Sequence, residues 1–367
     1  MFECWKEERI GMKTYGVIMA GGGGTRFWPM SRKAVPKQLL NLSGKDLMVN
    51  DTIDRFEGIV EKEDIYIVTN VVQADTMRTA TTGRLPESNI LAEPAARNTA
   101  ACIGYAAMEI IKKRGDGIMC ILASDHYIKN TEGFQTVLKD AVKTAQTTDA
   151  LVTLGIAPTF PSTGYGYIRS GEEVCGTNAY MVEDFVEKPD LETAEAYVEA
   201  GNYLWNSGMF IWKASTILGY FERLLPDIYA CLTEIGDSMG TPAEQETINR
   251  VYPVIPKISI DYGIMERADH VLVLKGDFGW NDIGSFDALT AIYEPDAKGN
   301  IGTGKRVMID TENSIICANK RLIATVGVQD LIVVETGDAV LVCHKSKAQD
   351  VKKIVETLEQ QGETGYL

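Results

Sequence analysis

The chain lacks the features that mark a membrane protein, a disulfide scaffold or a nucleic-acid binder. No apolar run approaches the roughly 18 residues that span a bilayer. Seven cysteines are present, but no two are spaced C-x-x-C, which argues against a zinc site and a disulfide framework. The three histidines are scattered, and the net charge of −15 argues against a broad basic face. We therefore expect a cytoplasmic protein with reduced thiols that binds neither membrane nor nucleic acid.

The remaining composition fits one large and one smaller domain. The chain has 367 residues, of which 45% are hydrophobic and 24% are charged. Its charged start, residues 1–13, has no apolar segment, so we do not expect a signal peptide there. We expect an N-terminal extension over residues 1–11, a larger domain over 12–292 and a β-rich C-terminal domain over 293–367.

Apolar runs alternate with segments of helical periodicity between residues 15 and 156. Strands are predicted at 15–20, 65–69, 90–92, 117–123 and 151–156, and helices at 99–114 and 134–147. This alternation is typical of a Rossmann-like, mostly parallel sheet with helices on both faces. Such sheets bind ligands at the carboxyl ends of their strands. A helical insert is expected over about 215–250.

The pattern of apolar and polar residues changes after a polar linker at 295–304. Short apolar runs recur at 307–310, 314–318, 322–326, 331–335 and 339–343, separated by turn residues. This spacing predicts a small all-β unit. The last segment, 347–361, has helical periodicity, with Val351, Ile354, Val355 and Leu358 expected to face inward.

A run of four glycines follows the first predicted strand. Ala20 leads into Gly21, Gly22, Gly23 and Gly24, then Thr25 and Arg26, and Lys37 comes eleven residues later. Backbone N–H groups without neighbouring side chains can close on phosphate oxygens, so the run and its two cations predict triphosphate binding. The alternative is a plain connection, because the G-x-G-x-x-G spacing fails at its last position.

Two aspartates are candidate metal ligands. Ser124 and Asp125 follow a predicted buried strand, and Asp282 lies in the segment Trp280–Ser285. Mg²⁺ takes one or two protein carboxylates together with phosphate oxygens. The alternative for Asp125 is that it caps a turn.

Glu93 and Asn98 lie between a predicted strand and a predicted helix. Their polar side chains could recognise a nucleotide base. The alternative is that Asn98 or Thr99 serves as the N-cap of the helix.

A third group of polar residues suits a sugar phosphate. Glu187 and Lys188 end a predicted strand, and Asn206 lies beside aromatic residues. Gly166 belongs to an aromatic turn, and Asp261 supplies a further carboxylate. The alternative for Glu187 and Lys188 is a solvated surface pair.

Several motifs together carry a resemblance to a known family. The run from Gly21 to Arg32 with Pro36-Lys37-Gln38 resembles the signature of the sugar-nucleotide pyrophosphorylases. The variants Phe27-Trp28-Pro29 and Lys37-Gln38, and the segment from Glu93 to Ala100, are similar to the mannose-1-phosphate guanylyltransferase branch. Six motifs stand in the expected order between residues 15 and 292, and the chain from about residue 300 resembles the family's β-helix-like domain.

The resemblance implies a nucleotide-diphospho-sugar transferase that converts GTP and α-D-mannose 1-phosphate into GDP-mannose and diphosphate by in-line attack on the α-phosphorus. Glu93 would accept hydrogen bonds from the guanine base, and Asp125 and Asp282 would hold Mg²⁺. The implied nucleotide-binding residues are Ala20, Gly21, Gly22, Gly23, Gly24, Thr25, Arg26, Glu93, Asn98 and Ser124. The implied sugar-binding residues are Gly166, Glu187, Lys188, Asn206 and Asp261, and the implied catalytic residues are Arg26, Lys37, Asp125 and Lys188.

The resemblance also bears on activity and assembly. Longer relatives carry an isomerase domain that this chain does not reach, so we expect a single activity. The edges of the β-rich tail are a surface on which a homodimer could form.

Three other functions stay open. A transferase acting on glucose 1-phosphate with UTP or dTTP would share the glycine run and Lys37. A glycosyltransferase usually has an Asp-x-Asp metal motif, whereas Asp125 is followed by His126 and Tyr127. A non-catalytic subunit that senses GDP-mannose is the third.

Overall fold

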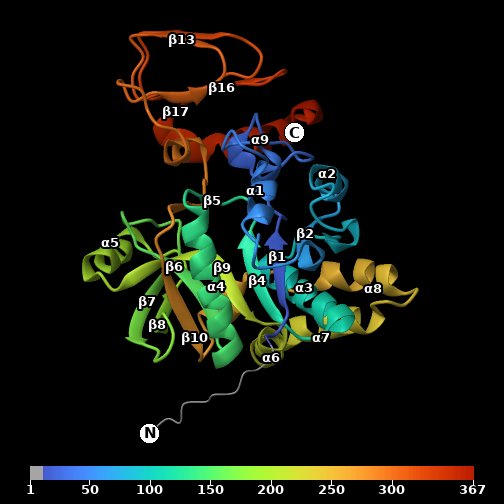
Figure 1. Cartoon of the computed structure of the whole chain (residues 1–367). Helices are drawn as coiled ribbons and strands as arrows, with labels where there is room; N and C mark the ends of the chain where they lie inside the picture. The colour runs from blue at the N-terminus through green and yellow to red at the C-terminus, as the bar shows by residue number, and fades with distance from the viewer. Residues whose placement is uncertain (1–10) are drawn as a thin grey trace.

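A nine-stranded sheet runs through the larger part of the protein (Figure 1). The computed structural model describes residues 11–367, so the expected N-terminal extension lies outside the described residues except for Gly11. The strand order is β3-β2-β1-β4-β9-β6-β10-β8-β7. The strands are β1 Thr14–Met19, β2 Ile65–Asn70, β3 Ile90–Glu93, β4 Ile118–Ala123, β6 Leu151–Ile156, β7 Tyr167–Glu173, β8 Ala179–Val186, β9 Tyr203–Lys213 and β10 Val271–Gly276.

Helices cover both faces of this sheet, as the alternation predicted. Neighbouring residues of a strand point to opposite faces, and in β1 Val17 belongs to one apolar core while Ile18 belongs to another. On the Val17 face, α3 (Asn98–Arg114) packs against α6 (Ala214–Leu224) and α7 (Pro226–Ser238). On the Ile18 face, α4 (Thr131–Thr148) lies over β6, β9 and β10 (Figure 1). The remaining helices before the C-terminal unit are α1 Met48–Asp54, α2 Ala74–Ala80, α5 Leu191–Ala200 and α8 Glu244–Val251.

The sheet is more mixed than the sequence suggested. Strands β3, β2, β1 and β4 are parallel, and β6 is parallel to β10. Strand β9 enters between β4 and β6 and runs antiparallel to both. The apolar runs up to residue 156 cannot reveal this insertion, because β9 comes later in the chain. The β7–β8 hairpin then extends the sheet on the far side of β10.

The C-terminal unit is a β-helix-like coil, as expected. Strands β12, β14 and β16 stack in parallel, and β13 and β15 form a second parallel pair. Strand β17 closes the coil antiparallel to β16. The strands are β12 Ile301–Thr303, β13 Arg306–Ile309, β14 Ile315–Cys317, β15 Ile323–Val326, β16 Leu331–Glu335 and β17 Val340–His344.

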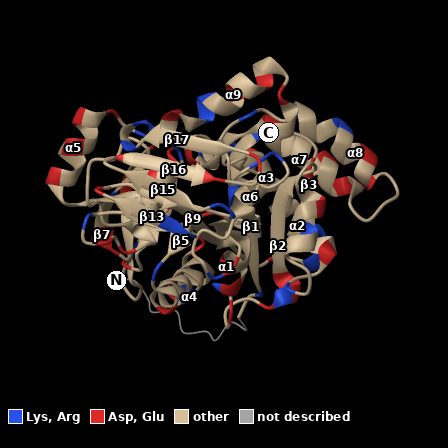
Figure 2. Ribbon diagram, turned by 90° about the horizontal axis from the view of Figure 1, so that it is seen from above, with Lys and Arg blue, Asp and Glu red and all other residues tan. Residues whose placement is uncertain are grey.

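The closing helix begins in a different form than predicted. Lys345–Val351 is a 3-10 segment, and the α-helix α9 covers only Lys352–Gln361. Val351 is buried, and Ile354, Val355 and Leu358 pack against the same apolar core from partly buried positions. Figure 2 shows the basic residues of α9 at its start and the acidic residues further along the helix.

One apolar core joins the C-terminal unit to the segment that follows the glycine run. Phe27 and Phe286 lie with ring centroids 4.9 Å apart, and both belong to a cluster with Ile315, Ile332 and Val351. The division into domains at residues 292 and 293 stays a prediction. Among residues 11–367, none of the helices combines the length and the apolar character needed to cross a membrane.

Candidate functional site

The carboxyl ends of β1, β3 and β4 bring the predicted nucleotide-binding residues to one edge of the sheet. Met19 lies opposite Ala123 in the register of β1 and β4, so the glycine run and Ser124–Asp125 leave the sheet side by side. The amide of Ser124 donates to the carbonyl of Met19 at 3.0 Å. Glu93 is the last residue of β3, two strands from β1 and on the opposite side of it from β4.

The glycine run presents unused amides. Within the described chain, the N–H groups of residues 21–26 donate to no protein acceptor. The buried side chain of Gln38 fixes the backbone of the run. Its Nε2 donates to the carbonyl oxygens of Ala20 at 2.7 Å and Gly22 at 3.2 Å. Gln38 belongs to the Pro36-Lys37-Gln38 motif, but the sequence alone indicates no role for it. A loop with free amides and a fixed backbone suits an anion.

Gly24 is needed for the shape of this loop. Its φ of 59° lies in the left-handed region that favours glycine. A Cβ added there would lie 2.4 Å from the Cβ of Lys37, closer than real side chains approach. The stem of Lys37 therefore occupies the space that only a glycine leaves.

Lys37 lies at the centre of the site. Its ammonium is almost fully buried and donates to Oδ2 of Asp125 at 3.0 Å and to the backbone carbonyl of Asp282 at 2.6 Å. Burial raises the pKa of Asp125, but the charge and hydrogen bond of Lys37, together with His126, outweigh burial and hold that pKa below its usual value. Oδ1 of Asp282 accepts from the hydroxyl of Tyr165 at 2.8 Å. The two predicted metal ligands thus meet around one ammonium.

These aspartates line a pocket of about 370 Å³. Its walls carry three cationic side chains and two carboxylates. The lining residues are Gly24, Thr25, Arg26, Phe27, Lys37, Asp125, His126, Asp282, Gly284 and Lys352. Among residues 11–367, no group of three or more His, Cys, Asp or Glu side chains is arranged to hold a metal. The carboxylates of Asp125 and Asp282 therefore fit Mg²⁺ only together with substrate oxygens.

A second pocket, of about 500 Å³, shares Asp125 with the first and lies over the start of α3. Its lining residues are Met19, Gly21, Gly22, Glu93, Ala96, Arg97, Asn98, Thr99, Cys102, Ala123, Asp125 and Lys257. Glu93 accepts a short hydrogen bond from the hydroxyl of Tyr252, and burial raises the pKa of Glu93 to about 6. Arg97 and Lys257 were missed: Arg97 lies in the segment from Glu93 to Ala100 but was given no role, and Lys257 stands in no motif that predicts a contact.

The N-cap alternative for Asn98 and Thr99 is wrong. No side chain caps the start of α3. Asn98 has a φ of 67°, and its Oδ1 accepts from the neighbouring Thr99 amide at 2.8 Å. The Thr99 hydroxyl instead accepts from the amide of Ile260 at 2.9 Å, which ties α3 to the loop before Asp261.

Each of the five predicted sugar-binding residues is in contact with at least one of the others. The register pairs Tyr167 with both Val186 and Trp205, so Gly166, Glu187 and Asn206 lie next to one another. A Cβ on Gly166 would lie 2.4 Å from Oε2 of Glu187. The backbone N–H of Asn206 donates to the Gly166 carbonyl at 2.8 Å, and its side-chain Nδ2 donates to Oδ1 of Asp261 at 2.8 Å.

Charges in this group are coupled. Lys188 forms a short ion pair with Glu187, whose side chain is only 7% exposed, so the pair is not simply solvated. Burial would lower the pKa of Lys188, but the pairing with Glu187 raises it overall. Burial, reinforced by the nearby Glu187, raises the pKa of Asp261 to about 6.

Aromatic side chains connect the sugar-side residues to the Lys37 pocket. Tyr165, next to Gly166, donates its hydroxyl to Asp282. Its ring lies 5.1 Å from that of Trp205 and 5.2 Å from that of Trp280, centroid to centroid. Trp280 in turn donates to Nδ1 of His126 at 3.1 Å. The predicted residues therefore line one continuous region.

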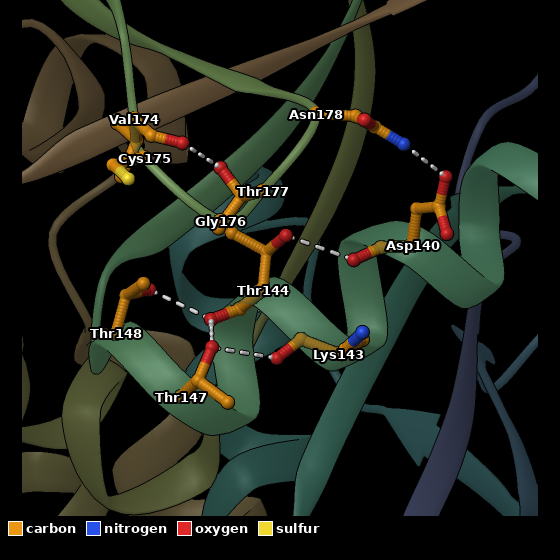
Figure 3. Close-up of a pocket in the computed structure, with 10 residues that line it drawn as sticks. All are labelled: Asp140, Lys143, Thr144, Thr147, Thr148, Val174, Cys175, Gly176, Thr177 and Asn178. Atoms are coloured by element: carbon orange, nitrogen blue, oxygen red, sulfur yellow. Dashed lines mark hydrogen bonds between the residues drawn. The ribbon is translucent and has the colours of Figure 1, made fainter. Parts of the chain in front are cut away.

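A further hollow, of about 590 Å³, lies elsewhere and contains none of the predicted residues. It opens between the end of α4 and the turn that joins β7 to β8 (Figure 3). Its polar groups bind one another: Asn178 donates to Oδ2 of Asp140 at 2.8 Å, and the Thr144 hydroxyl donates to the Asp140 carbonyl at 2.9 Å. We assign it no function.

Comparison with known families shows what this arrangement belongs to. A family model described as "Nucleotidyl transferase" matches residues 15–299. The chain belongs to the nucleotidyl transferase family. A second model, "MannoseP isomerase/GMP-like beta-helix domain", matches residues 304–358.

Named relatives place the chain within this family. It is 41% identical to a mannose-1-phosphate guanylyltransferase of Salmonella typhimurium and 40% identical to a mannose-1-phosphate guanylyltransferase of Escherichia coli. Both alignments cover 95% of this chain and 74% of the relative. A crystal structure from Thermus thermophilus, described as a mannose-1-phosphate geranyltransferase, is 34% identical with a TM-score of 0.87 and covers 95% of this chain and 100% of its own.

The substitution Gly24→Ala tests the packing of the loop. We expect it to lower the free energy of unfolding by about 2–4 kcal/mol, because backbone strain adds to the overlap with Lys37. Gly44→Ala is the matched control, since Gly44 also has a positive φ of 77° but faces open space. It should cost only about 1 kcal/mol. Urea unfolding of both variants is the measurement, and equal losses would contradict the packing argument.

Proposed function

We propose that the chain transfers guanylyl groups from GTP to α-D-mannose 1-phosphate, releasing GDP-mannose and diphosphate. The observation that carries this proposal is that the two pockets share Asp125 and adjoin the contacts of Asn206 with Gly166 and Asp261. The phosphates and base of the nucleotide and the sugar of the second substrate could then be bound next to one another. The names of the relatives at about 40% identity support this choice of base and sugar.

Each part of the substrate pair has residues suited to it. The free amides of residues 21–26 and the Arg26 guanidinium would hold the leaving phosphates, and Lys37 would neutralise an adjacent oxygen. Lys188 would meet the sugar phosphate, while Glu187, Asn206 and Asp261 would accept or donate to sugar hydroxyls. Ala20 and Ser124 would support the loop from the strand ends.

The reaction needs no protein nucleophile. An oxygen of mannose 1-phosphate attacks the α-phosphorus, the new P–O bond forms, and the bond to the β-phosphate oxygen breaks with departure of diphosphate. The two reactants are both anions, so holding them in line and neutralising the charge is the main contribution of the chain.

A divalent metal fits the two carboxylates of the first pocket. The nucleotidyl transferase family generally uses such an ion. Asp125 and Asp282 are the residues that would hold Mg²⁺. When bound, it would supply positive charge to phosphate oxygens and so favour attack on phosphorus.

Guanine recognition is assigned to Glu93. A buried carboxylate can accept from both N1–H and N2–H₂ of guanine, which uracil and thymine do not present together. Asn98 lines the same pocket and would add a polar contact.

A substrate matrix tests the reaction. Released diphosphate should be highest with GTP and mannose 1-phosphate, compared with UTP, dTTP and glucose 1-phosphate. Asp125→Ala or EDTA should abolish turnover, because the metal loses its carboxylate or is removed. A preference for UTP or dTTP with glucose 1-phosphate would favour the related transferase instead, and absence of turnover with every pair would favour a sensing subunit.

The pKa of Glu93 predicts how GTP binding depends on pH. Protonation removes the acceptor, so the KM for GTP should rise by about tenfold per pH unit below pH 6. The Tyr252 hydroxyl lowers the pKa of Glu93, so Tyr252→Phe should move this rise to higher pH. Steady-state kinetics between pH 5 and 8 provide the measurement, and a KM for GTP that does not change over this range would exclude an ionised Glu93 as the acceptor.

We further propose a cytoplasmic homodimer. GTP is a cytoplasmic metabolite, and β13 and β15 of the C-terminal unit expose Val307, Ile309 and Val326. Analytical ultracentrifugation would decide the assembly, and a monomer at micromolar concentration would contradict it.

A further inference from the structure

The C-terminal unit contributes a cation to the phosphate pocket. Lys352, the first residue of α9, lines the same 370 Å³ pocket as Arg26, Lys37, Asp125 and Asp282. It is the only lining residue of that pocket that comes from beyond residue 300. Neither the sequence motifs nor the roles proposed above include it.

Several contacts fix the start of α9 at this position. Val351 is buried in the core that contains Phe27, next to Arg26. Gln349, one turn earlier, donates through Nε2 to the hydroxyl of Ser285 at 2.7 Å, close in sequence to Asp282. The backbone before and at Lys352 is therefore tied to both walls of the pocket.

Further contacts anchor the rest of the C-terminal unit to the segment after the glycine run. Trp28 donates through Nε1 to the carbonyl of Tyr366 at 2.8 Å. Arg32 forms an ion pair with Asp338 at 2.9 Å. Lys33 forms another with Glu359, on α9, at 2.8 Å. Movement of the C-terminal unit away from the pocket would break all of these contacts.

The charges of the pocket leave Lys352 available for a ligand. Lys37 is already held by Asp125 and by the carbonyl of Asp282. Within the described chain, Arg26 and Lys352 form no ion pair and no side-chain hydrogen bond. Both line a pocket that adjoins the free amides of the glycine run. A diphosphate or triphosphate group carries more negative charge than Arg26 alone can neutralise.

We propose that Lys352 binds the β- or γ-phosphate of the nucleotide and the diphosphate that leaves, so that the β-helix-like unit is part of the active site. This inference rests on the proposed function and extends it to a residue outside the matched nucleotidyl transferase segment. Lysine suits this position, because its ammonium is a compact charge on a flexible stem and can follow the departing group.

Lys352→Ala tests the proposal, with Lys353→Ala as the matched control. Lys353 is the next residue on α9, but its ammonium pairs with Asp350 at 2.8 Å and it does not line the pocket. Removal of Lys352 should raise the KM for GTP and the inhibition constant of inorganic diphosphate by about tenfold, the loss of one charge-assisted hydrogen bond. The KM for mannose 1-phosphate should change less than about twofold. Lys352→Arg should recover most of the loss.

Direct titration of inorganic diphosphate by calorimetry separates this inference from the proposed function. If wild-type protein binds diphosphate more tightly than Lys352→Ala but makes no GDP-mannose, the proposed function fails and the anion contact stands. If wild-type protein makes GDP-mannose and Lys352→Ala binds diphosphate as tightly as Lys353→Ala does, the inference is overturned. Lys352 is exposed, so both variants should unfold at the wild-type temperature.

Discussion

The buried ammonium of Lys37 is the interaction on which the site depends. It joins Asp125 at 3.0 Å and the Asp282 carbonyl at 2.6 Å, residues that lie 88 and 245 positions away in the chain. A buried charge needs such partners, because leaving one unpaired costs several kcal/mol. The aliphatic part of the Lys37 side chain also restricts the facing position, Gly24, to glycine, because a Cβ there would overlap with it. The Lys37 side chain thus sets the positions of the glycine run, Asp125 and Asp282 together.

The second constraint is the core that the catalytic region shares with the C-terminal unit. Phe27 and Phe286 lie within the same cluster as Ile332 and Val351, so the residues after the glycine run and after Asp282 are packed against the β-helix-like coil. The coil therefore supports the segments that line the site, and the helix α9 that follows it supplies one lining residue, Lys352. This arrangement gives a physical reason for its presence next to a nucleotidyl transferase domain.

Much of this could be predicted from local sequence, because parallel strands deliver their carboxyl ends to one edge. The glycine run and Asp125 each follow a buried strand and Glu93 ends one, and the structure brings them together as that rule requires. The β-rich character of the C-terminal unit also followed from the regular spacing of short apolar runs, whereas its β-helix-like form was implied only by the family resemblance. What could not be predicted depends on packing between distant segments. Strand β9 enters the sheet from later in the chain, and Lys352 reaches the pocket only because α9 packs beside Phe27.

A crystal structure of the protein with GTP and Mg²⁺ would test the central claim most directly. The account predicts phosphate density against the amides of residues 21–26 and the Lys37 pocket, metal density between Asp125 and Asp282, and guanine against Glu93. Density for the nucleotide in the hollow between α4 and the β7–β8 turn, with the glycine run unoccupied, would contradict it.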